Sequence, residues 1–98
     1  MHTKYVPLSM EIEFDPSKAE GNWKKHGVSL SDSEPVLYDP RALTREDTSS
    51  EMEQRFITVG MDALGRVLTV VWTERKNSIR IISARKASKK ERENYEEL

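Results

Sequence analysis

The chain has 98 residues, of which 36% are hydrophobic and 34% charged, and its formal net charge at pH 7 is -1. This length allows one domain with a single core. The chain has no cysteine, which excludes disulfides, thiolate zinc sites and cysteine nucleophiles. Apolar runs are far shorter than the roughly 20 residues that cross a bilayer, and the N-terminus lacks the apolar core of a signal peptide. We therefore expect no membrane segment and a cytoplasmic protein.

The N-terminal part of the chain contains one predicted strand. Residues 1–9 show no periodicity and are expected to form a flexible leader, whereas residues 10–98 are expected to form a single domain. Met10 to Phe14 alternates apolar with acidic residues. This period of two is typical of a half-buried strand.

A helix is predicted directly after this strand. Asp15 can accept hydrogen bonds from the first free amides of the helix, and Pro16 suits its first position. The helix is expected to end at His26, because Gly27 readily adopts the left-handed conformation that stops a helix. Trp23 is predicted to be its main core residue.

The middle of the chain carries weaker signals. Ser29 with Asp32 resembles a capping box and predicts a short second helix, which Asp39–Pro40 should end. Residues 41–45 are predicted to form a weak strand. Residues 46–53 are polar without apolar periodicity, so we expect a mobile loop there.

The second half of the chain is predicted to be mostly strands. Residues 54–59 alternate as a strand does, and two runs rich in β-branched residues, 67–72 and 79–84, predict an antiparallel hairpin. These two runs are apolar on both faces, which places the hairpin at the centre of the sheet. Ser88 and Glu91 form a capping box for a last helix. This order predicts an α+β fold with helices on one face of an antiparallel sheet.

Positive charge is concentrated in and after the hairpin. Between residues 75 and 92 there is a single acidic residue, Glu91, and the basic residues are Arg75, Lys76, Arg80, Arg85, Lys86, Lys89, Lys90 and Arg92. Two apolar strands followed by a lysine-rich run indicate a sheet surface that faces a polyanion.

Three residues are candidates for chemistry. His26 could act as an acid or base near neutral pH, or it could simply cap the carbonyls at the end of its helix. Arg80 and Arg85 are separated by five residues, so regular alternation sends them to opposite faces. A bulge would have to reorient one of them if both serve one site. The simpler alternative is that both are ordinary surface charges.

Other catalytic classes lack support in the sequence. The four glycines never cluster, which excludes a P-loop. Ser83 has neither a nucleophile-elbow motif nor a second histidine to support it. The paired carboxylates are expected to be exposed surface charges.

The chain combines six segments: Phe14-Asp15-Pro16, Lys25-His26-Gly27-Val28-Ser29, Asp39-Pro40, Glu53-Gln54-Arg55-Phe56 with Gly60, Thr73-Glu74-Arg75, and Ile79-Arg80-Ile81-Ile82-Ser83-Ala84-Arg85-Lys86-Ala87. This combination resembles the BrnT family. The last segment is long and specific. The resemblance spans residues 10–98.

The resemblance implies a RelE-like ribonuclease toxin of a type II toxin–antitoxin system, whose sheet meets RNA on the face away from the helices. It also implies a BrnA-like antitoxin with a ribbon-helix-helix region, and it calls for no cofactor and no metal. In such an endoribonuclease the 2′-hydroxyl of the substrate attacks the scissile phosphate, so the protein supplies positioning, proton transfer and charge stabilisation. We expect His26, Arg80 and Arg85 to be catalytic, and Lys25, Arg55 and Lys86 to bind RNA.

Two functional hypotheses remain open at this point. The first is a ribonuclease toxin, and the second is a noncatalytic toxin homologue that acts as a protein-binding or corepressor subunit. A structural scaffold that pairs with a partner through an exposed sheet edge is a third alternative.

Overall fold

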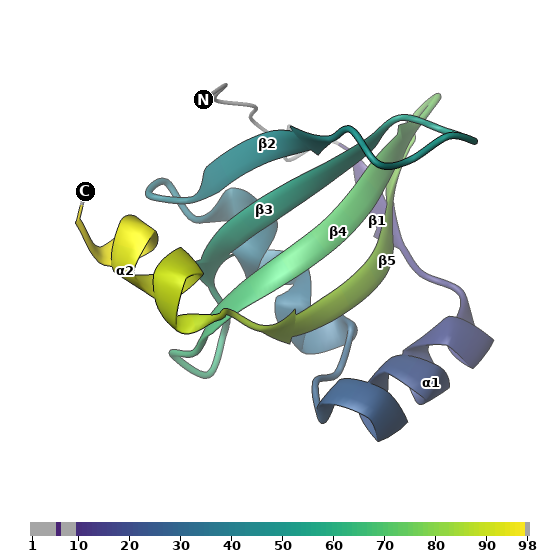
Figure 1. The fold of residues 1–98 in the computed structure, drawn as a ribbon. Coiled ribbons are helices and arrows are strands. Elements are labelled where there is room, and N and C mark those ends of the chain that lie inside the picture. Colours follow the sequence, from purple (N-terminus) through teal and green to yellow (C-terminus); the bar gives the residue numbers. More distant parts are fainter. Residues whose placement is uncertain (1–5, 7–9, 98) are drawn as a thin grey trace.

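The computed structural model describes residue 6 and residues 10–97, which form a five-stranded sheet with three helices around it (Figure 1). The leader predicted for residues 1–9 falls outside the described residues except for Val6, which is buried in the core. No helix in the described part of the chain is long and apolar enough to cross a membrane.

The helices and strands follow one another in the order expected from the sequence. They are β1 (Glu11–Glu13), α1 (Pro16–His26), the 3-10 helix η1 (Ser31–Tyr38), β2 (Leu43–Asp47), β3 (Arg55–Met61), β4 (Val67–Arg75), β5 (Ser78–Lys86) and α2 (Lys89–Glu96). The predicted loop after β2 is shorter than expected, because β2 continues through Asp47 by pairing with β3.

The sheet has the strand order β1-β5-β4-β3-β2. Both strands of the predicted hairpin, β4 and β5, are therefore paired on both sides, which confirms their central position. The α+β class is also confirmed, but the sheet is not wholly antiparallel, because β1 pairs with β5 in parallel. No tight turn joins these two strands, so nothing forces them to run in opposite directions.

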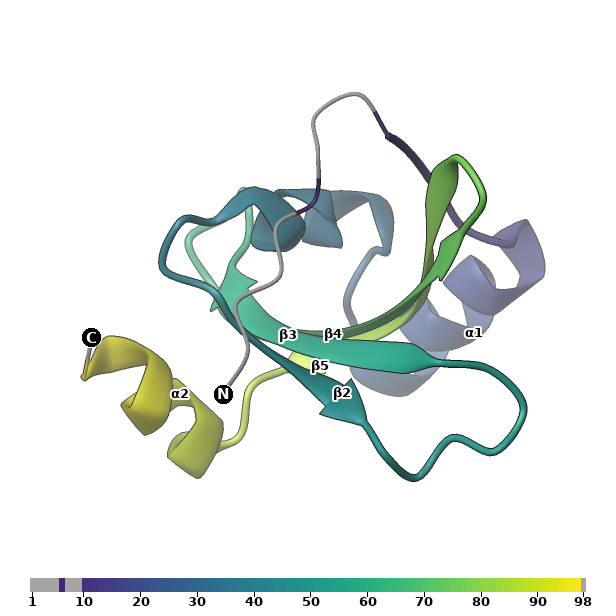
Figure 2. The ribbon, with the colours of Figure 1, turned by 90° about the horizontal axis from the view of Figure 1, so that it is seen from above.

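One face of the sheet forms the hydrophobic core. Trp72 is fully buried there and donates a hydrogen bond of 2.8 Å from Nε1 to Oγ1 of Thr58. Val70 and Ile81 on the same face are also fully buried. The 3-10 helix η1 covers this face (Figure 2) and contributes Val36 to the core.

Helix α1 begins and ends as predicted, but it contacts the sheet through a different residue. Asp15 caps its start and Gly27 ends it with a φ of 67°. Trp23, predicted to be the core residue, is 60% exposed, and Asn22 is buried instead. The Asn22 amide pairs with both the carbonyl and the N–H of Ala84 at 2.8 and 3.1 Å. Because β1 covers only the first three residues of β5, this edge of β5 needs other partners, and Asn22 supplies them.

The second helix differs from the prediction in type and in start. It is a 3-10 helix that begins at Ser31, and no side chain caps it. The Ser29 hydroxyl bonds the Ser31 hydroxyl rather than a helix amide. Pro35 lies inside the helix, where its missing N–H suits a short 3-10 segment better than a continuing α-helix.

Helix α2 packs beside β3 on the opposite side of the sheet from η1 (Figure 2). The predicted capping box of Ser88 and Glu91 is present at its start. Near its end, the buried Tyr95 donates a hydrogen bond from its hydroxyl to Asp39. Burial and this bond raise the pKa of Tyr95 to about 12, so the phenol keeps its proton and its bond throughout the physiological range.

Replacing Asn22 with alanine should lower the free energy of unfolding by on the order of 2 kcal/mol, because the buried backbone groups of Ala84 would lose their partner. Chemical denaturation followed by circular dichroism measures this change.

Gly21→Ala is a matched control on the same helix. A Cβ at Gly21 meets nothing within 4 Å, so alanine should stabilise the helix by about 0.5 to 1 kcal/mol. An Asn22→Ala protein as stable as the wild type would contradict the proposed role of the amide.

Candidate nucleic-acid interface

A bulge in β5 brings the two predicted catalytic arginines to the same face of the sheet. Val71 pairs with Ser83 and Trp72 pairs with Ile81, so Ile82 is an extra residue without a partner on β4. One extra residue reverses the alternation of side chains beyond it. Arg80 and Arg85, which regular alternation would separate, therefore both point away from the core.

Three further arginines share this face, one of which is Arg75, two residues after Thr73, the partner of Arg80. In directly paired positions, side chains point to the same side of a sheet. Arg45 pairs with Ile57, which pairs with Val71, and Arg55 lies two residues before Ile57 on the same side. We call the face that carries Arg45, Arg55, Arg75, Arg80 and Arg85 the arginine face. Its charge comes from four different strands, and this is the feature that suits it to a phosphate backbone.

Three of these arginines are paired with carboxylates. The ion pairs are Arg80 with Glu13 at 3.3 Å, Arg55 with Glu53 at 3.3 Å, and Arg85 with Glu91 at 2.7 Å. Arg85 uses both terminal nitrogens to hold both oxygens of its partner. This two-bond geometry is the one an arginine offers to a phosphate.

Glu91 is the most strongly perturbed acid on the arginine face. The hydrogen bonds from Arg85, helped by one from the Ser88 N–H, outweigh burial and lower the pKa of Glu91 from 4.5 to about 2. Thr69, a residue that is only 1% exposed, turns its hydroxyl toward this carboxylate without completing a hydrogen bond. Glu91 is therefore ionised at neutral pH and holds α2 against β5.

His26 and Lys25 lie on α1, beside the sheet edge rather than on the arginine face. His26 follows Asn22 by four residues and so shares its side of the helix, and Asn22 bonds Ala84, the neighbour of Arg85. Among the described residues no hydrogen bond or ion pair joins His26 to an arginine. Lys25 is exposed.

Lys86 is separated from the arginine face. It follows Arg85 directly on β5 and by alternation points to the other side. At the end of β5 it lines a hollow of about 410 Å³ together with Arg66 and Arg92. The structure thus brings together Arg55, Arg80 and Arg85 among the predicted site residues, and it does not add Lys86 to them.

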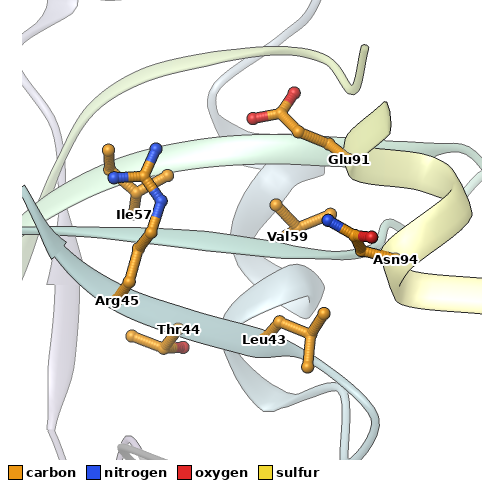
Figure 3. Close-up of a pocket in the computed structure, with 7 residues that line it drawn as sticks. All are labelled: Leu43, Thr44, Arg45, Ile57, Val59, Glu91 and Asn94. Carbon is orange, nitrogen blue, oxygen red and sulfur yellow. The ribbon is translucent and has the colours of Figure 1, made fainter. Parts of the chain in front are cut away.

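The sequence reasoning missed a pocket between α2 and the strands β2 and β3. It has a volume of about 100 Å³ and is lined by Leu43, Thr44, Arg45, Ile57, Val59, Glu91 and Asn94 (Figure 3). The period-two pattern of β2, which gives Leu43 and Arg45 a common face, is the signal that could have indicated it. No group of three or more histidine, aspartate or glutamate side chains in the described ranges could hold a metal ion.

The fold and this face define a small α+β protein with an arginine-bearing sheet surface suited to a polyanion. Residues 14–91 match the family model described as the ribonuclease toxin BrnT of a type II toxin–antitoxin system, and the chain belongs to this family. The crystal structure of the Brucella abortus ribonuclease toxin BrnT has the same fold, with a TM-score of 0.61 and 23% identity over 82% of this chain and 99% of that chain. No curated protein matches the chain.

Replacing Glu91 with glutamine should test the charge of this residue without removing its cap, because glutamine also suits the capping box. At pH 6 the wild type should be more stable by about 1 kcal/mol, a modest value because the Arg85 side chain is 44% exposed. A pKa lowered from 4.5 to about 2 on folding stabilises the protein above the unfolded value and loses this effect as the pH falls toward the folded one.

Denaturation curves at several pH values between 6 and about 2 measure this difference. The gap between the wild type and Glu91→Gln should be constant above about pH 5 and close on further acidification. A gap that widens in acid would mean that Glu91 does not stabilise the fold through its charge.

Proposed function

We propose that this chain is an endoribonuclease toxin that cleaves RNA without a metal ion in its reaction and thereby inhibits translation and growth. The 2′-oxygen of the substrate attacks the adjacent phosphorus, its proton passes to water, and the bond to the 5′-oxygen breaks. The products are a 2′,3′-cyclic phosphate and a 5′-hydroxyl. The observation that carries the proposal is the bulge at Ile82, because it aligns Arg80 and Arg85 on one open face in a member of this family.

In this proposal the arginines bind the scissile phosphate. A guanidinium has five N–H donors, and Arg85 uses three of them on Glu91 and the Lys86 carbonyl. Its remaining donors can bind a phosphate oxygen while Glu91 fixes its orientation. Arg80, whose side chain is 36% exposed, binds a second oxygen. Together they stabilise the charge that develops in the transition state.

The remaining predicted residues have supporting roles. His26 donates a proton to the leaving 5′-oxygen as a general acid. Arg55 contacts a neighbouring phosphate from β3. Lys25 and Lys86 lie away from the arginine face, so they would contact the RNA backbone where it leaves the sheet.

The partners of this toxin are an RNA substrate and an antitoxin that neutralises it in the cytoplasm. We propose a BrnA-like antitoxin with a ribbon-helix-helix region, forming a complex that also represses the operon. Membership of a type II toxin–antitoxin family supports a protein partner.

The second candidate function is a noncatalytic toxin homologue that binds its partner protein without cleaving RNA. One observation favours it. Arg55, Arg80 and Arg85 each have a carboxylate partner, which partly neutralises the charge that would attract phosphate.

Incubating the purified chain with RNA in the presence of a chelator should yield products with cyclic phosphate or 3′-phosphate ends, detected by end-labelling. Arg80→Ala and Arg85→Ala should each abolish cleavage and growth inhibition, with a loss of about 10² to 10³ in rate, as for other lost transition-state donors. Both should fold normally, since partly exposed ion pairs contribute about 1 kcal/mol or less to stability.

Lys18→Ala is the control, because Lys18 is exposed on α1 and has no proposed role. It should cleave as the wild type does. RNA that stays intact at high protein concentration would favour the noncatalytic homologue. A melting temperature many degrees lower for either variant would mean that the arginine is structural.

His26→Gln should retain the fold yet reduce cleavage by about 10² to 10⁴, the usual effect of losing a positioned acid or base. The pH–rate profile distinguishes catalysis from capping. The wild-type rate should fall on the alkaline side, where the acid has lost its proton, and this dependence should be absent in the variant. Identical profiles would remove His26 from the mechanism.

A further inference from the structure

The pocket beside α2 has the composition of a base-binding site. Its floor is aliphatic and consists of Leu43, Ile57 and Val59 from two neighbouring strands (Figure 3). Its rim is polar and carries Arg45, Glu91 and Asn94. A flat apolar floor with a few convergent polar groups is the usual design of a small-molecule site.

Two of the rim side chains are available to a ligand. Within the described part of the chain, neither Arg45 nor Asn94 makes a hydrogen bond or ion pair through its side chain. Both are exposed on the open side of the pocket. In Figure 3 Arg45 extends from β2 and Asn94 from α2, so they reach the pocket from different elements.

The pocket adjoins the proposed phosphate site. Leu43 pairs with Val59, Val59 with Thr69, and Thr69 with Arg85. Two of the three floor residues therefore lie in one row with Arg85 across the strands. Glu91 lines the pocket and also holds Arg85. A nucleotide whose phosphate is bound to Arg85 would therefore have its base within reach of the pocket.

We propose that this pocket binds one purine base of the RNA next to the cleaved bond, with Arg45 and Asn94 as the residues that determine base preference. The inference rests on the proposed ribonuclease function. Arginine pairs through two hydrogen bonds with guanine, and asparagine does so with adenine. A single-stranded RNA exposes these base edges. At about 100 Å³ the pocket is far smaller than the 300 Å³ or more of a drug-sized site. It therefore suits one base rather than a larger ligand.

Binding of short deoxydinucleotides to the full chain tests the proposal, because they lack the attacking 2′-hydroxyl and cannot be cleaved. Each of the four bases is placed on either side of one phosphate, and the methyl signals of Ile57 and Val59 are followed by NMR. Purine-containing dinucleotides should shift these signals and bind about tenfold more tightly than pyrimidine ones.

Asn94→Ala and Arg45→Ala should reduce this preference to within about twofold, while binding to Arg80 and Arg85 remains. Lys90→Ala is the matched control, because Lys90 is exposed on the same helix and does not line the pocket. It should leave the preference unchanged.

Equal binding of purines and pyrimidines, or no shift at Ile57 and Val59, would overturn the proposal. The proposal would also be overturned if the methyl signals of Ile57 and Val59 shifted on binding of a co-purified antitoxin but not on binding of a nucleotide. That result would identify the pocket as a protein contact. Because no bond is cleaved in this experiment, purine binding can be measured even if the chain is noncatalytic. Conversely, cleavage by a chain without base preference would overturn this inference alone.

Discussion

The extra residue in β5 is the constraint on which the functional surface depends. The core requires Ile81 and Ala84 to point inward, and they are an odd number of residues apart, which a regular strand does not permit. The bulge at Ile82 satisfies the core and, by the same shift, turns Arg80 and Arg85 outward together. The packing of the core face therefore determines which side chains of β5 point to the opposite face.

One acidic residue, Glu91, supports the structure of the arginine face. Glu91 belongs to an acid-rich tail in the sequence, yet it orients the Arg85 guanidinium and closes the first turn of α2. Tyr95 fixes the same helix to Asp39 one turn later. These two attachments hold α2 in place, and α2 contributes Glu91 and Asn94 to the pocket. A net charge of -1 is compatible with a locally positive surface, because the arginines are gathered on one face.

Local signals predicted most of the fold. The caps at Asp15, Gly27 and Ser88 and the apolar strands of the hairpin are set by short-range chemistry, and each appears in the structure. Long-range contacts decided the rest. Trp23 has the right spacing for a core residue, but the free edge of β5 selects Asn22, an amide that can bond a backbone. The pocket was missed because it joins β2 and β3 to α2, which lies far from them in the sequence.

Asn22 has a consequence for how this sheet can associate with other chains. An exposed strand edge is a template on which a foreign strand can add. On the outer side of β5, the Asn22 amide already occupies the N–H and carbonyl of Ala84, so no strand can extend the sheet there. The outer strands of the sheet are β1 and β2, and β2 ends in Arg45, Glu46 and Asp47. Charged residues of this kind discourage nonspecific strand addition and limit aggregation.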